Sequence, residues 1–106
     1  MAEVTEILNK LLERTKDNRV VWKSTPAPQT FVAVIGKNSV IIQLDNSDQP
    51  IFRVNNKTGE TIDSMTRRNY PGIGWQDQLR ELHELARRMA LEVDNELDEL
   101  LKALSE

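Results

Sequence analysis

The sequence predicts an α+β domain in which a five-stranded antiparallel β-meander lies between an N-terminal helix and a long C-terminal helix. Apolar residues recur every three or four positions near both ends of the chain, as in amphipathic helices. Short runs rich in β-branched residues fill the middle, and the turns between them are too short for parallel crossovers. With 106 residues, 39% hydrophobic and 29% charged, the chain fits one globular domain over residues 1–106.

The first helix is predicted over residues 3–16, where Val4, Leu8 and Leu11 share one face and charged side chains occupy the other. Five strands are predicted over the middle of the chain: residues 19–24, 30–35, 39–44, 51–55 and 60–65. Gly36 and Gly59 lie in two of the turns, where a residue of positive φ is needed.

The second predicted strand is apolar on both faces. Phe31 and Ala33 lie on one face, and Val32 and Val34 lie on the other. Because a strand that is apolar on both sides is usually covered on both sides, we expect a second layer over at least part of the sheet.

The longest periodic segment covers residues 76–104. As a single helix it would be about 43 Å long, whereas a compact chain of this size has a diameter of roughly 33 Å. Either the helix is continuous or gently kinked and packs against another copy of the chain, or it breaks near Val93-Asp94 and folds back onto the first helix. We favour the first solution, which predicts a homodimer or higher homo-oligomer. The predicted self-association residues are apolar and lie in the last three turns: Val93, Leu97, Leu100, Leu101 and Leu104.

No sequence motif indicates catalysis, a cofactor or a metal site, so we expect a protein that is not an enzyme. The chain has no cysteine, which excludes thiol chemistry and zinc sites built on thiolates. His83 is the only histidine and has no triad partners at a recognisable spacing, so we interpret it as a residue on the flank of a helix, bonded to a neighbour or to water. Asp45–Asp48 lacks the later ligands of a calcium loop, and Gly72–Gly74 is a weak match to a phosphate-binding loop.

The best candidate binding segment is the irregular stretch over residues 66–75, which contains Arg67, Arg68, Tyr70 and Trp75. Arginine beside aromatic rings suits a protein interface, and it also suits stacking on single-stranded bases or contact with phosphates. Alternatively, Trp75 anchors the loop in the core and the arginines pair with nearby acids. Arg87, in the following helix, is a further candidate.

Two alternative functions remain open beside a self-associating interaction module that binds another protein or a small ligand. One is a nucleic-acid-associated protein that uses Arg67, Arg68, Arg87 and Arg88. The other is a small-ligand-binding domain with a pocket between sheet and helix, lined by His83, Tyr70 and Trp75. The net charge of −3 argues against non-specific nucleic-acid binding, since residues 92–106 carry one base and six acids.

The chain contains neither a secretory signal pattern nor a run of apolar residues long enough to span a membrane. Together with the absence of cysteine, this predicts a cytoplasmic location. The order of helix, sheet and long helix is loosely similar to small bacterial proteins, which favours a bacterial source.

Overall fold

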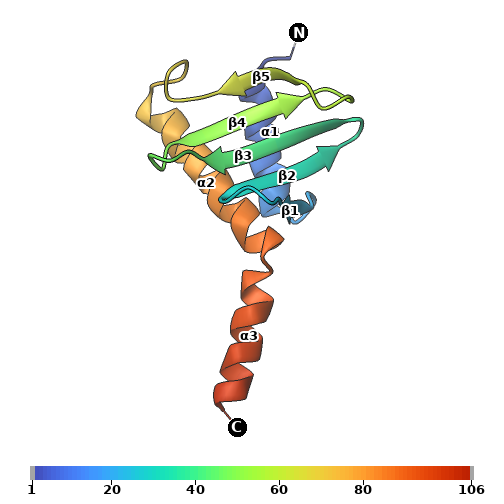
Figure 1. The fold of residues 1–106 in the computed structure, drawn as a ribbon, viewed down its shortest axis with the longest axis vertical. Helices are drawn as coiled ribbons and strands as arrows, with labels where there is room; N and C mark the ends of the chain where they lie inside the picture. Colours follow the sequence, from blue (N-terminus) through green and yellow to red (C-terminus); the bar gives the residue numbers. More distant parts are fainter. Residues whose placement is uncertain (1, 106) are drawn as a thin grey trace.

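The computed structural model describes residues 2–105 and confirms the α+β architecture (Figure 1). The elements follow in chain order: α1 Val4–Lys16, β1 Trp22–Ser24, β2 Thr30–Ile35, β3 Asn38–Leu44, β4 Pro50–Asn55, β5 Thr61–Met65, α2 Ile73–Ala90 and α3 Val93–Leu104. The five strands form one antiparallel sheet in the order β1-β2-β3-β4-β5. Each strand therefore pairs with its neighbour in sequence, as in the predicted meander.

The register of the sheet aligns its bulky side chains in a row. Phe31 lies opposite Ile42, Ile42 opposite Phe52, and Phe52 opposite Met65. All four side chains are buried. Because side chains alternate between the two faces of a strand, this row defines one apolar face of the sheet.

Both α1 and α2 pack on this face and leave the other face of the sheet open (Figure 1). Leu8 of α1 and Leu79 and Leu82 of α2 are fully buried against the sheet. The indole N–H of Trp22 donates a hydrogen bond to Thr15 Oγ1 at 3.2 Å, which joins β1 to the end of α1. The core is therefore a two-layer sandwich of two helices on one sheet.

The expectation of a second covering layer is wrong for the single chain. Val34 is 74% exposed on the open face, and Val32 and Ile41 are only partly buried. Val32 lies opposite Ile41, so these branched side chains shield each other across the strands. Arg53, opposite Ile41, extends over the same face and donates a hydrogen bond to Gln43 Oε1 at 2.6 Å. Mutual shielding of this kind does not need another layer.

Two element boundaries differ clearly from the predicted ones. β1 begins at Trp22 rather than at residue 19, because Asn18 has a φ of 59° and the N–H of Arg19 bonds the carbonyl of Arg14. The chain thus uses residues 17–21 to end α1 and reach the sheet. α2 begins at Ile73 rather than at residue 76, directly after an extended Gly72.

The C-terminal segment, favoured as one continuous or gently kinked helix, instead forms two helices, α2 and α3, which are joined through Leu91 and Glu92. The break lies close to the position of the alternative prediction at Val93-Asp94. However, α3 does not fold back onto α1, and none of its residues is buried. It extends away from the two-layer body (Figure 1), and the molecule measures 55 × 30 × 26 Å.

Candidate functional site

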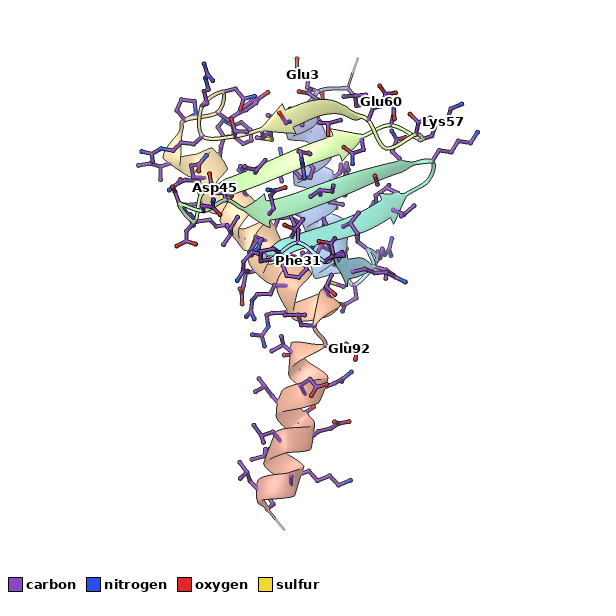
Figure 2. All side chains as sticks on the ribbon, viewed as in Figure 1. Glu3, Phe31, Asp45, Lys57, Glu60 and Glu92 are labelled. Carbon is purple, nitrogen blue, oxygen red and sulfur yellow. The ribbon has the colours of Figure 1, made fainter. Side chains whose placement is uncertain are left out.

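The most unusual surface of the molecule is the apolar stripe of α3. The stripe consists of the five predicted self-association residues: Val93, Leu97, Leu100, Leu101 and Leu104. Their spacing places them on one side of the helix, and the four leucines are 54–76% exposed. Figure 2 shows the side chains of α3 projecting outward with no other element beside them. The structure therefore brings all five residues together on one free surface.

Acidic side chains border the α3 stripe on both sides. By helical spacing, Asp94 lies along one edge and Glu96 along the other, while Lys102 lies on the opposite side of the helix. Asp94 and Glu96 also occupy the first turn, where the helix dipole favours negative charge. The stripe is thus an apolar surface with an acidic rim.

The junction between α2 and α3 is compact and strained. Glu92, labelled in Figure 2, has a φ of 51° and a ψ of 43°, which places it in the left-handed helical region. A residue with a side chain pays about 1–2 kcal/mol for this conformation. The N–H of Glu92 bonds the carbonyl of Met89 at 3.2 Å, and Arg88 forms an ion pair with Asp94 across the break. The direction of α3 is thus set by two residues and one exposed ion pair.

A second apolar surface is a hollow of about 440 Å³ between α1 and the sheet, which we call the α1 groove. It is lined by α1, by the segment that follows it and by the hairpin ends of the sheet: Ala2, Val4, Ile7, Lys10, Leu11, Arg14, Val20, Ile35, Asn38, Val40, Val54, Ile62 and Asp63. Three isoleucines around it, Ile7, Ile35 and Ile62, are 37–59% exposed. The α1 groove therefore has an exposed apolar rim, while the core residues that line it are at most 6% exposed.

Sequence reasoning missed the α1 groove. The small-ligand alternative placed a pocket beside His83, Tyr70 and Trp75, but none of these residues lines the α1 groove. Ile7 was the available signal, because it widens the apolar face of α1 beyond what α2 and the sheet cover.

In the segment over residues 66–75, whose last three residues begin α2, the two aromatic rings hold the preceding loop in place. Tyr70 and Trp75 pack edge to face with ring centroids 6.0 Å apart, and both contact the core. Asn69 accepts hydrogen bonds from the N–H and the hydroxyl of Thr66. The rings are therefore engaged within the fold, as expected if Trp75 anchors the loop.

The candidate arginines do not converge. Arg67 and Arg68 are exposed beside a shallow hollow that also contains Asp45. Arg87 makes two hydrogen bonds to the carboxylate of Glu84, at 2.8 and 3.0 Å, and Arg88 pairs with Asp94 near the break. Arg67 and Arg68 precede the start of α2, whereas Arg87 and Arg88 lie near its end, about 20 Å along the helix.

His83 is buried, at 5% exposure, rather than on the flank of the helix. Its ring nitrogen Nε2 lies 3.0 Å from the carbonyl oxygen of Gln29, and its ring packs against Phe31 with centroids 5.4 Å apart. Because a carbonyl only accepts, Nε2 carries the proton of the neutral ring. Burial lowers the pKa of His83, and the hydrogen bond to Gln29 partly opposes this effect. The residue joins α2 to the β1–β2 loop.

The described part of the chain offers few other functional signals. Within residues 2–105, no three or more histidine or acidic side chains come together as metal ligands would. No helix in this range combines the length and the apolar character that a membrane crossing requires. Comparison with protein-family models, with curated proteins and with solved structures found no match.

Proposed function

We propose that this protein is an interaction module that self-associates through α3 to form a homodimer. The observation that carries the proposal is the apolar stripe of α3, since four leucines on one helix face have no partner within the described chain. A soluble domain rarely exposes a contiguous apolar surface of this kind unless another molecule covers it. The reducing cytoplasm of a bacterium is the setting predicted by the sequence.

A dimer that buries both copies of α3 is energetically more favourable than an assembly that buries only one. Complete burial of a leucine contributes on the order of 1.5–3 kcal/mol. Covering four leucines that are already partly buried therefore contributes about 4–8 kcal/mol per helix. Association costs about 4–15 kcal/mol in lost translational and rotational freedom. A symmetric dimer buries both copies of α3 and offsets this cost better than an arrangement that covers only one.

The direct test replaces Leu100 with aspartate. A carboxylate at the centre of the stripe has to be desolvated in any assembly that covers it, so we expect the dissociation constant to rise by about 30-fold or more. Leu100 is 56% exposed, so the fold of the single chain stays intact. The measurement is molar mass by light scattering over a dilution series, with far-UV circular dichroism to verify folding.

Asn95→Asp is the matched control. It adds the same charge to the same helix, but helical spacing places residue 95 on the side opposite the stripe. We expect it to associate like the unmodified chain. If Leu100→Asp and the unmodified chain have the same mass at every concentration, α3 is not the association surface.

The two alternative functions have less support from the geometry. The four arginines of the nucleic-acid alternative lie in two separate pairs, and the second pair is matched by carboxylates. The accessible apolar hollow lies away from the three residues of the small-ligand alternative. Both alternatives remain predictions from the sequence.

A further inference from the structure

We propose that the α1 groove of one copy receives α3 of a second copy, so that the dimer forms by reciprocal exchange of C-terminal helices. This inference rests on the proposed self-association and names the surface that covers the stripe. Amphipathic helices commonly bind by laying their apolar face into a groove of this type. The two surfaces match in length, in apolar character and in charge.

The lengths of the two surfaces agree. Val4, Ile7, Leu11 and Arg14 line the groove and recur every three or four residues. The groove therefore follows one face of α1 for about 15 Å. The α3 stripe covers about 16 Å of its own helix by the same rise per residue.

Of the eleven large apolar residues that are exposed in the described chain, three lie around the groove and four lie in the α3 stripe. Ile7, Ile35 and Ile62 surround the groove, and Val40 and Val54 of the sheet lie inside it. Val40 and Val54 are on the face of the sheet that α1 and α2 cover, so the groove is a gap in the helix layer. A third helix placed there packs against α1 and the sheet and completes the layer.

The charges favour the groove over pairing of two α3 helices. The groove is bordered by Lys10 and Arg14, with Asp63 as the opposing charge. The stripe of α3 is bordered by Glu96 and by Asp94, which in the single chain pairs with Arg88. Two stripes facing each other bring like charges together, whereas a stripe in the groove brings acids to bases.

The groove that receives α3 belongs to the partner copy, because α3 cannot reach the groove of its own chain. α1 packs beside α2, and no residue of α2 lines the groove, so α1 separates the two. With packed helices 8–10 Å apart, a helix in the groove has its axis roughly 18 Å from that of α2. The connection from Ala90 to Val93 extends at most about 10 Å. Reciprocal exchange between two copies avoids this limit.

Thiol crosslinking tests the proposal directly, because the chain has no cysteine of its own. Leu100→Cys protein is mixed with size-tagged Ile62→Cys protein and treated with a short bismaleimide. Ile62 lines the groove, so we expect the 62–100 product to dominate over the 100–100 product. Val34→Cys is the control, since it is at least as exposed but lies on the open sheet face.

The outcomes separate this inference from the proposed function. A dominant 100–100 product, with Leu100→Asp still dissociating the dimer, overturns groove docking and leaves self-association through α3 intact. If the 34–100 product forms in the same yield as the 62–100 product, groove docking is overturned as well. Ile62→Cys/Leu100→Cys protein that crosslinks within a single chain shows docking in the chain's own groove and contradicts exchange. Unmodified protein that is monomeric at all concentrations removes the proposed function itself.

Discussion

Single buried polar side chains join the elements of this fold at defined points. His83 joins α2 to the β1–β2 loop through Gln29, and Trp22 joins β1 to α1 through Thr15. The sequence identified His83 as a helical residue but placed it on the flank. Leu79, Leu82 and His83 occupy positions i, i+3 and i+4 of α2, so they share one buried face of the helix. The acceptor, a loop carbonyl distant in sequence, could not be predicted because it depends on tertiary packing.

The buried histidine predicts a loss of stability in mild acid. The folded-state pKa of His83 lies below its ordinary value, so the unfolded chain takes up a proton at a higher pH than the folded chain. The free energy of unfolding therefore falls as the pH drops from about 7 through the ordinary histidine value of about 6.5. We expect His83→Gln to lose less stability over this range, by urea unfolding at each pH. The neighbouring charges of Glu84, Arg87 and Arg80 have smaller effects on the pKa of His83 than burial does. Equal losses of stability in the unmodified protein and in His83→Gln would contradict the burial effect.

The elements of the sheet and of α1 could be predicted well from the sequence. Their turns contain glycine, asparagine or proline, and their apolar periodicity is unambiguous. The break between α2 and α3 could not be predicted with the same certainty. Neither glycine nor proline occurs near Leu91 and Glu92, and the apolar spacing continues through them. The left-handed conformation of Glu92 is a local backbone choice that the pattern does not encode.

α3 has twelve residues, none of which is buried, so it is close to the limit for an isolated helix in water. We expect its backbone amides to exchange with deuterium almost as fast as unfolded ones in dilute protein. In concentrated protein, where association covers the stripe, exchange over residues 97–104 slows at least about tenfold. Peptides from β3, which lies inside the sheet, serve as the control and stay protected at both concentrations. Equal exchange of α3 at both concentrations would rule out a role in association.

At the scale of the whole molecule, the α3 stripe and the α1 groove are apolar surfaces that the rest of residues 2–105 leaves uncovered. The stripe of α3 follows from the sequence, because the last leucines exceed what one compact copy can bury. The α1 groove does not follow from the sequence, since it depends on how α1 and α2 share one face of the sheet. The one-sided helix layer explains both surfaces, because it leaves the groove beside α1 open while the short connection after α2 keeps α3 of the same chain from reaching it.

The molar mass in solution tests the central claim most directly. We predict that light scattering of the unmodified chain gives twice the 12.2 kDa of one copy at high concentration and falls toward 12.2 kDa on dilution. A constant mass of one chain, from the most dilute to the most concentrated sample, would contradict self-association through α3.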